Sequence, residues 1–228
     1  MTEQVAGIIV AGGASIRMGF DKLWADLCGR PVLAWPLLAF AQCEDVHHLI
    51  VVTSPENRQR VASLLGELAL QASVVEGGAT RRDSVLAGLS ATDDEWVVVH
   101  DAARPLVDHT LISRALSTAR ETGAAIVAVP ETSTVKRIDD GIVVSTEDRD
   151  ALWLAQTPQA FRRELLMEAQ RRFPGPATDD SVLVEALGVS VRVAEGAYAN
   201  IKLTTPVDLQ LAALLLLERR RLEQPGAS

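Results

Sequence analysis

The feature that most constrains the fold is an alternation of short apolar runs with longer stretches of helical periodicity. This alternation is typical of βαβ units, in which parallel strands form one sheet that helices cover. Uninterrupted hydrophobic runs indicate strands buried on both faces, and such runs occupy Val5–Ala11, Leu49–Thr53, Ser73–Val75, Trp96–His100, Ala125–Val129 and Val189–Val193. Apolar residues at helical spacing occupy Pro31–Ala41, Pro55–Leu68, Arg82–Leu89, Asp108–Thr122 and Arg163–Arg172. The sequence therefore predicts an α/β fold with a mostly parallel sheet flanked by helices.

Residues 131–150 depart from this alternation, because they are polar and rich in Thr, Ser and Asp. Within them, Asp139-Asp140-Gly141 separates two short β-rich runs, which is a hairpin signal. A two-stranded ribbon is marginally stable alone. We therefore expect a protruding β-hairpin arm that packs against another molecule, with a partner subunit as the natural candidate. From the whole sequence, we predict a single domain over residues 1–224 and a disordered tail at residues 225–228.

Length and composition fit one large α/β domain, since 228 residues with 48% hydrophobic side chains suffice for a sizeable core. The formal net charge of -8 argues against nucleic acid as the main partner, because phosphate-backbone affinity needs an excess of Lys and Arg. Leu209–Leu217 is apolar but shorter than the roughly 20 residues of a bilayer span, so a packed C-terminal helix is favoured over membrane association. Cys28 and Cys43 have neither disulfide-framework nor metal-ligand spacing, which favours a reducing cytoplasm.

The first candidate site is a glycine loop that follows the first predicted strand. Ala11-Gly12-Gly13 ends that strand, and the basic Arg17 and Lys22 follow closely. Such a loop exposes backbone N–H groups and can hold phosphates. Two glycines after a strand are commonly just a turn, but the two basic residues favour an anion site. A Walker loop and a dinucleotide-binding fingerprint both require glycine spacings that are absent here.

A second candidate site lies at the end of the predicted strand Trp96–His100. Asp101 and Arg104 follow that strand, at the edge where open α/β sheets bind ligands. Asp101 could instead be a helix cap or turn residue. One carboxylate beside a triphosphate is nevertheless sufficient to anchor Mg²⁺, so the nearby glycine loop favours a metal role.

Two weaker signals accompany these sites. Gly77-Gly78 precedes a predicted helix whose Ser84 could contact a base edge, and Lys202 lies on a short strand before a proline-initiated helix. The four histidines have no metal-ligand spacing, so we interpret all of them as structural or surface residues.

Five blocks in a fixed order carry a resemblance to a known family. They are Ala11-Gly12-Gly13 with Arg17-Met18 and Lys22; Gly77-Gly78 with Arg81 and Asp83-Ser84-Val85; His100-Asp101-Ala102-Ala103-Arg104-Pro105; Leu152-Trp153-Leu154-Ala155-Gln156-Thr157-Pro158-Gln159; and Asn200-Ile201-Lys202. With these blocks the chain resembles the 2-C-methyl-D-erythritol 4-phosphate cytidylyltransferase family of the non-mevalonate isoprenoid pathway. The resemblance implies a Rossmann-like sheet, CTP as cytidylyl donor, the erythritol phosphate as acceptor, and a homodimer whose arm reaches the neighbouring active site.

The resemblance also implies roles for individual residues. Contacts to the reacting phosphates would come from Arg17, Lys22 and Lys202, and Mg²⁺ or another divalent cation would bind Asp101. The nucleotide would be held by Ala11, Gly12, Gly13, Gly78, Ser84 and Ala102. The acceptor would be held by Arg104 and Thr157, and across the dimer by Thr134 and Arg149. Ser15 stands where the family commonly has a second glycine, and Ala79 and Ala199 stand where some members carry aspartate.

The implied reaction explains why the candidate site lacks a catalytic base. A phosphate monoester has a second pKa of about 6, so the attacking oxygen is already ionised near neutral pH. Three alternatives remain open at this point. They are a ribitol 5-phosphate cytidylyltransferase, a molybdenum-cofactor-type nucleotidyltransferase, and a non-catalytic nucleotide-sensing subunit that kept the fold.

Overall fold

The computed structural model describes residues 3–12, 21–173, 177 and 179–223. Its centre is a seven-stranded sheet in the order β11-β7-β10-β6-β1-β4-β5. The strands are β1 (Val5–Ala11), β4 (His48–Thr53), β5 (Ser73–Glu76), β6 (Trp96–Asp101), β7 (Ala124–Pro130), β10 (Trp153–Arg162) and β11 (Arg192–Glu195). The pairs β1–β4, β1–β6, β4–β5 and β7–β11 are parallel, whereas β10 is antiparallel to both of its neighbours. The predicted α/β fold with a Rossmann-like, mostly parallel sheet is therefore confirmed.

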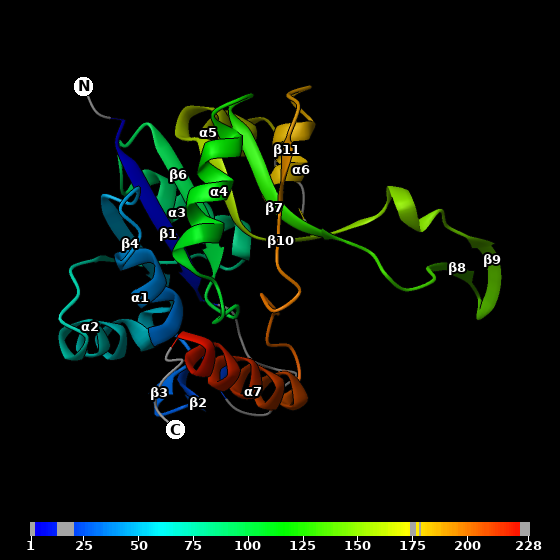
Figure 1. Ribbon diagram of the computed structural model, residues 1–228. Helices are drawn as coiled ribbons and strands as arrows, with labels where there is room; N and C mark the ends of the chain where they lie inside the picture. The colour runs from blue at the N-terminus through cyan, green and yellow to red at the C-terminus, as the bar shows by residue number, and fades with distance from the viewer. Residues whose placement is uncertain (1–2, 13–20, 174–176, 178, 224–228) are drawn as a thin grey trace.

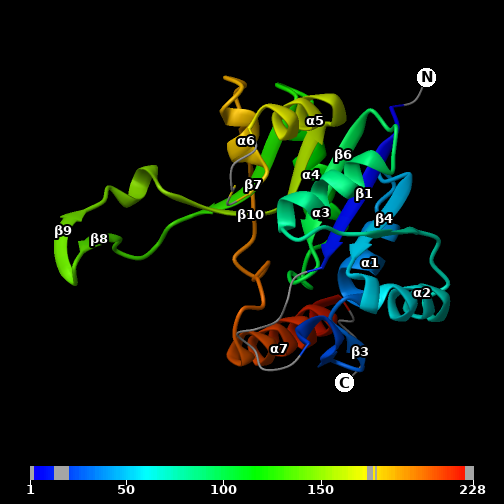
Figure 2. The same cartoon turned by 180° about the vertical axis from the view of Figure 1, so that it is seen from behind.

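Helices cover both faces of this sheet and make a three-layer architecture (Figures 1 and 2). They are α1 (Ala34–Ala41), α2 (Arg58–Glu67), α3 (Arg81–Ser90), α4 (His109–Ala119), α5 (Arg163–Arg172), α6 (Ser181–Glu185) and α7 (Pro206–Glu223), with short 3₁₀ turns η2 (Lys22–Trp24), η3 (Pro55–Asn57) and η4 (Arg149–Ala151). Neighbouring residues of one strand point to opposite faces. Ile9 packs in the apolar cluster that includes α1 and α4, and Ile8 packs in the cluster that includes α3 and α5.

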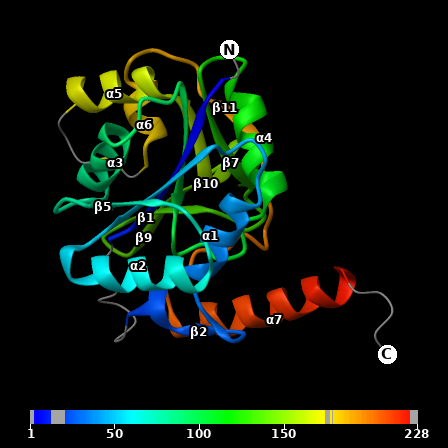
Figure 3. The same ribbon diagram turned by 90° about the vertical axis from the view of Figure 1, so that its left-hand side faces the viewer.

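The C-terminal helix lies across the carboxyl end of the central strands. Figure 3 shows α7 beside the small hairpin β2 (Asp26–Leu27) and β3 (Arg30–Pro31). Its Ala212 and Leu216 are buried in the same cluster as α1. Over the described residues, no helix combines the length and apolarity that a membrane crossing requires.

Several element boundaries differ from the sequence predictions. Pro31 was predicted to begin a helix, but it ends β3, and bonds from Val32 N to Ala25 O and Leu33 N to Leu23 O extend that hairpin. The helix begins at Ala34 instead. The strand predicted at Val189–Val193 begins at Arg192, because pairing with β7 starts there.

The predicted arm is confirmed as a protruding β-hairpin. It consists of β8 (Lys136–Asp139) and β9 (Ile142–Thr146), which Asp140 and Gly141 connect with φ values of 44° and 75°. Positive φ at both central residues is the requirement of a type I′ hairpin turn. The arm leaves the sheet between β7 and β10 and extends away from the body (Figures 1 and 2).

Candidate active site

The fold places Asp101 at the carboxyl edge of the sheet, beside the end of β1. Every residue of β6 is buried, and Asp101 is its last residue. Val10 pairs with Asp101, and Ala102 N–H donates to Val10 O over 3.1 Å. The predicted metal ligand therefore lies next to Ala11 and Gly12, where the glycine loop begins. This is the edge at which open α/β sheets bind ligands.

Two cations hold the carboxylate of Asp101. Arg81 Nε donates to Oδ1 over 2.8 Å, and Lys202 Nζ donates to Oδ2 over 2.6 Å. Burial alone would raise the pKa of Asp101, but the charges of Arg81 and Lys202 outweigh burial and hold that pKa well below its usual value. The side chain is therefore an anion at neutral pH.

Lys22 contacts the segment that carries Lys202, although the two lysines come from opposite ends of the chain. The segment that carries Lys202 is anchored by Leu203 N–H, which donates to Ala103 O over 2.8 Å. Lys22 Nζ donates to Leu203 O over 2.9 Å. The structure thus brings together Asp101 and two of the three predicted phosphate-contacting residues, and it concentrates positive charge locally in a chain whose net charge is -8.

The loop after Asp101 is held by a hydrogen-bond relay through His100 and Thr157. The carbonyl of Arg104 can only accept, so the His100 Nε2 that lies 3.1 Å away carries the proton. His100 Nδ1 then accepts from Thr157 Oγ1 over 3.0 Å, and Thr157 Oγ1 accepts from Asp101 N–H over 3.1 Å. Complete burial lowers the pKa of His100 to about 4. The ring is therefore neutral, and its role is structural, as we interpreted it from the sequence.

Arg104 and Thr157, the two predicted acceptor contacts of the main body, lie beside this relay. Arg104 Nη1 donates to Asn200 O over 2.8 Å, and Nη2 donates to Ala155 O over 3.3 Å. Burial lowers the pKa of Arg104 below its ordinary value. Thr157 is buried with its hydroxyl engaged at both hydrogen-bonding positions described above. These contacts tie the loop after β6 to β10 and to the segment of Lys202.

The predicted nucleotide-binding glycines gather beside the start of α3. Gly77 N–H donates to Thr53 O over 2.8 Å, so this loop lies against the end of β4. A Cβ on Gly78 would lie 2.3 Å from Asp83 Cβ. Any larger residue at this position would therefore require the backbone of the loop or of α3 to move. Ser84 Oγ lies 3.6 Å from the Cβ position of Gly12 and donates to Thr80 O over 3.1 Å. Gly12, Gly78 and Ser84 therefore line one region although they are distant in sequence.

Other predicted residues lie elsewhere. Thr134 and Arg149 are on the arm, and both are exposed. Arg149 Nη1 donates to Thr132 O over 3.1 Å, and the arm extends away from the body of the chain (Figure 1). Ala79 and Ala199 are exposed, and no third carboxylate, thiol or imidazole joins a metal-ligand cluster among the residues that the structure describes. Gly13 and Arg17 lie outside the described residues.

Prediction from the sequence missed two charged residues next to the site, the partly buried Arg81 and the buried Asp180. Arg81 belongs to one of the five sequence blocks, but no role was predicted for it. No role was predicted for Asp180 either. Arg81 Nη1 lies 2.9 Å from Asp180 Oδ2, and the Asp180 side chain is 2% exposed. The position of Arg81 directly after a Gly-Gly loop was an available signal. Asp180 offered none, because only the fold brings it to Arg81.

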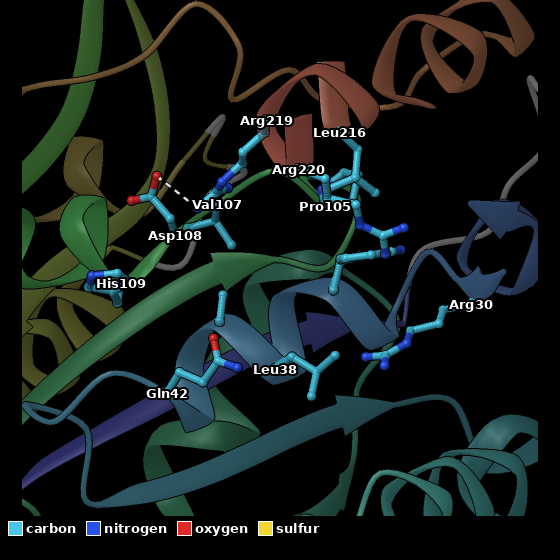
Figure 4. A pocket seen from close by; sticks show the side chains of 12 residues that line it. Arg30, Leu38, Gln42, Pro105, Val107, Asp108, His109, Leu216, Arg219 and Arg220 are labelled. Atoms are coloured by element: carbon cyan, nitrogen blue, oxygen red, sulfur yellow. Dashed lines mark ion pairs between the residues drawn. The ribbon is translucent and has the colours of Figure 1, made fainter. Parts of the chain in front are cut away.

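A separate cavity of about 220 Å³ lies between α1, the loop at residues 105–109 and α7 (Figure 4). Arg30 and Arg220 both lie near the Trp35 ring, with their guanidinium carbons 5.8 and 4.9 Å from its centre. Arg219 pairs with Asp108 over 3.3 Å. No residue that the sequence predicted for the site lines this cavity.

Comparison with known proteins identifies the family of the chain. The family model of 2-C-methyl-D-erythritol 4-phosphate cytidylyltransferase matches residues 5–218. A relative of that name from Dehalococcoides mccartyi is 43% identical over 225 residues, which cover 96% of this chain and 99% of the relative.

Solved structures give the same result. The 4-diphosphocytidyl-2C-methyl-D-erythritol synthase of Anaerococcus prevotii has a TM-score of 0.85 at 30% identity and covers 94% of this chain and 99% of its own. The 2-C-methyl-D-erythritol 4-phosphate cytidylyltransferase of Thermus thermophilus has a TM-score of 0.78 at 35% identity and covers 92% of this chain and 98% of its own. The chain therefore belongs to the 2-C-methyl-D-erythritol 4-phosphate cytidylyltransferase family.

Proposed function

We propose that this protein transfers the cytidylyl group of CTP to 2-C-methyl-D-erythritol 4-phosphate, forming 4-diphosphocytidyl-2-C-methyl-D-erythritol and pyrophosphate. The observation that carries the proposal is the cluster of Asp101, Lys22 and Lys202 at the carboxyl edge of the sheet. Relatives that match almost the whole chain are named for this activity. The two enzyme alternatives, a ribitol 5-phosphate cytidylyltransferase and a molybdenum-cofactor-type nucleotidyltransferase, have no comparable support.

The chemical step is an in-line substitution at the α-phosphorus of CTP. An oxygen of the acceptor's phosphate forms the new P–O bond, while the bond to the bridging α–β oxygen breaks and pyrophosphate leaves with the electron pair. The attacking oxygen is largely ionised above its second pKa of about 6. No base is required, and the neutral, fully hydrogen-bonded His100 is not available as one.

Catalysis in this proposal is alignment and charge stabilisation. Lys22, Lys202 and Arg17 offset the repulsion between two polyanions and stabilise the charge that grows on the leaving pyrophosphate. Ala11, Gly12, Gly13 and Ala102 contribute backbone contacts to the nucleotide. Gly78 and Ser84 contact cytosine, a role that agrees with the proximity of Ser84 to Gly12 and of Gly78 to Asp83 at the start of α3. Arg104 and Thr157 line the acceptor side.

The residues present fit a divalent cation bound together with the triphosphate. Mg²⁺ accepts one or two carboxylates and completes its shell with phosphate oxygens and water. Asp101 supplies a hard oxygen ligand, and its lowered pKa keeps that ligand ionised. Mg²⁺ would neutralise triphosphate charge there. Another divalent cation is also compatible with a single carboxylate.

We also propose a homodimer through the arm. Ile138, Ile142 and Val144 expose 53%, 69% and 59% of their surfaces on a ribbon that extends away from the described body of the chain (Figure 1). In a dimer, this apolar arm would be covered, and Thr134 and Arg149 would reach the partner's acceptor site.

A cytoplasmic location agrees with the free thiols of Cys28 and Cys43. The net charge of -8 supports neither nucleic acid nor an anionic membrane as a partner.

The decisive experiment measures pyrophosphate release from CTP with one acceptor at a time. We expect turnover with 2-C-methyl-D-erythritol 4-phosphate and at most trace turnover with ribitol 5-phosphate or molybdopterin. CTP should be preferred over ATP, GTP and UTP. Absence of turnover with every acceptor, together with measurable CTP binding, would instead support the non-catalytic nucleotide-sensing subunit.

A further inference from the structure

A buried chain of charges continues from Asp101 into the body of the protein. Arg81, the first residue of α3, donates from Nε to Asp101 Oδ1 over 2.8 Å and places Nη1 2.9 Å from Asp180 Oδ2. Asp180 immediately precedes α6, and its backbone N–H donates to the buried Gln159 Oε1 over 3.3 Å. One guanidinium therefore bridges the predicted metal ligand and a second carboxylate that solvent does not reach.

The two cations on Asp101 differ in how firmly they are held. The Lys202 side chain is 41% exposed and has a flexible stem, whereas the Arg81 side chain is 29% exposed and contacts two carboxylates. The planar guanidinium is also suited to a fixed bridging geometry. Lys202 can therefore move from Oδ2 to an incoming phosphate, while Arg81 stays on Oδ1. Oδ2 would then be the Asp101 oxygen available to a divalent cation.

Asp180 contributes charge rather than a well-formed hydrogen bond. Within the described part of the chain, Asp180 Oδ2 and Arg81 Nη2 are buried and have no hydrogen-bond partner, although the ion pair itself is short. Burial raises the pKa of Asp180, and Arg81 is the group that opposes this rise. Burial also tends to lower the pKa of Arg81, but Asp180 and Asp101 together raise it, so Arg81 keeps its charge.

This arrangement divides one positive charge between two carboxylates. If Arg81 paired with Asp101 alone, it would neutralise more of the charge that Asp101 offers to a cation, and ligand charge determines much of the affinity of a hard metal. We infer that Asp180 is a positioning residue that acts through Arg81 and sets how strongly Asp101 binds the divalent cation of the nucleotide complex. The inference rests on the proposed function, because that function provides the metal and the nucleotide.

The test uses Mn²⁺ as a paramagnetic substitute for Mg²⁺. Free Mn²⁺ is measured by electron paramagnetic resonance while the metal is titrated into the full-length protein with CTP and without acceptor, so no turnover is needed. Asp180→Asn removes the charge and keeps the shape, and we expect Mn²⁺ binding to weaken on the order of tenfold. In parallel assays with acceptor, the Mg²⁺ concentration for half-maximal rate should rise by a similar factor, with kcat at saturating Mg²⁺ nearly unchanged.

Asp179→Asn is the matched control, because it removes the same charge one residue away. Asp179 accepts from Ser181 Oγ and Val182 N–H, and its side chain makes no ion pair with Arg81. We expect its Mn²⁺ affinity to stay within about threefold of wild type. An equal loss of Mn²⁺ affinity in both variants would mean that removing any negative charge in this region has the same electrostatic effect. That result would overturn the role of Asp180.

The double variant Arg81→Gln/Asp180→Asn removes the bridging cation and its balancing anion together. Its Mn²⁺ affinity should return at least to the wild-type range, which a purely structural role of Asp180 would not produce. It also keeps the test valid if Asp180→Asn alone does not fold, because no unpaired buried charge remains. An affinity well below wild type in the double variant, or an unchanged affinity in Asp180→Asn, would contradict the inference. Wild-type pyrophosphate release, assayed first, shows separately whether the proposed function itself holds.

Discussion

At the scale of single residues, the fold brings Lys22 and Lys202 together from two motifs that are far apart in the sequence. Lys202 contacts Asp101 directly, and Lys22 holds the backbone of the segment that carries Lys202. A surface lysine is normally solvated and contributes little when it is removed. These specific contacts at one edge of the sheet, made from positions 180 residues apart along the chain, distinguish them from such lysines.

Replacing either lysine by alanine should leave the fold intact and reduce kcat by roughly 10²–10³, the usual effect of losing one preorganised charge donor. Steady-state pyrophosphate release and circular dichroism would measure the two effects. Arg192→Ala is a suitable control, since Arg192 is a half-exposed cation paired with Glu121 over 2.9 Å and lies at the start of β11. Near-normal kcat in Lys202→Ala would remove that residue from the mechanism.

His100 makes stability depend on pH. Its folded pKa of about 4 lies below its ordinary value of 6.5, so the unfolded chain binds the extra proton first as the pH falls. The neutral ring therefore contributes its full stabilisation above pH 6.5, and this contribution decreases down to about pH 4, by at most about 3 kcal/mol. Urea unfolding at pH 7, 5.5 and 4.5 should show this decline. In His100→Gln, which does not titrate, the decline should be smaller; an identical pH profile would assign it to other groups.

At the scale of elements, the close approach of the Gly77-Gly78 loop to α3 determines the shape of the predicted base-binding region. Helix α3 begins with a capping box in which Thr80 and Asp83 bond each other's backbone N–H groups. That box brings Asp83 against Gly78, where a Cβ would lie 2.3 Å from Asp83 Cβ. The glycine is therefore required for space, and its φ is not in the left-handed region.

Gly78→Ala should displace the start of α3 and raise the KM for CTP about tenfold or more, with a smaller effect on the KM of the acceptor. The expected size corresponds to the loss of roughly 1–3 kcal/mol that overpacking costs. Gly66→Ala is the matched control, because nothing lies within 4 Å of its Cβ position in α2. Alanine there should be neutral or slightly stabilising. Equal KM values for CTP in wild type and Gly78→Ala would contradict a steric role.

The elements that could be predicted from the sequence are those whose local hydrophobic pattern matches their burial in the fold. β1 and α5 have the predicted bounds, because an uninterrupted apolar run and a helical period specify them locally. β10 was missed as a strand because Gln156-Thr157-Pro158-Gln159 interrupts it, and proline normally argues against a central strand. The structure accommodates these residues with a register shift in the pairing of β10 with β7. That adjustment depends on neighbouring strands and has no local signal.

The site residues also divide into those with a local sequence signal and those that depend on the rest of the fold. Asp101 and Lys202 could be proposed from motifs, yet their 2.6 Å contact follows only from the packing of the Lys202 segment on Ala103. Asp180 could not be proposed, because a single aspartate before a short helix is usually a cap. Its partner Arg81 lies 99 positions away in sequence. Charge pairs between residues this far apart in sequence can be identified only from the three-dimensional arrangement of the elements.

At the scale of the whole molecule, the arm extends away from the other elements that the structure describes (Figure 1). β8 and β9 pair only with each other, and the base of the arm is fixed by Tyr198 Oη, which donates to Pro130 O over 2.8 Å. Exposed apolar residues on such a ribbon indicate an interaction surface. The single domain over residues 1–224 and the dimer both stay predictions, and the second leads to a direct test.

Arg149→Ala should raise the KM of the acceptor more than the KM of CTP, because the arm is proposed to contact only the acceptor. If the arm acts across a dimer, this variant and Lys202→Ala should complement each other. In a mixed dimer, the Arg149→Ala subunit keeps Lys202 and receives an intact arm from its partner, so one of the two sites is complete. Random exchange makes about half of the dimers mixed, which predicts recovery of roughly one quarter of wild-type activity from two impaired parents. Pyrophosphate release from the unfractionated mixture would measure this recovery, and heterodimers purified through two different tags should show about half of wild-type activity. Activity that never exceeds the average of the parents would show that each arm serves its own chain or no site at all.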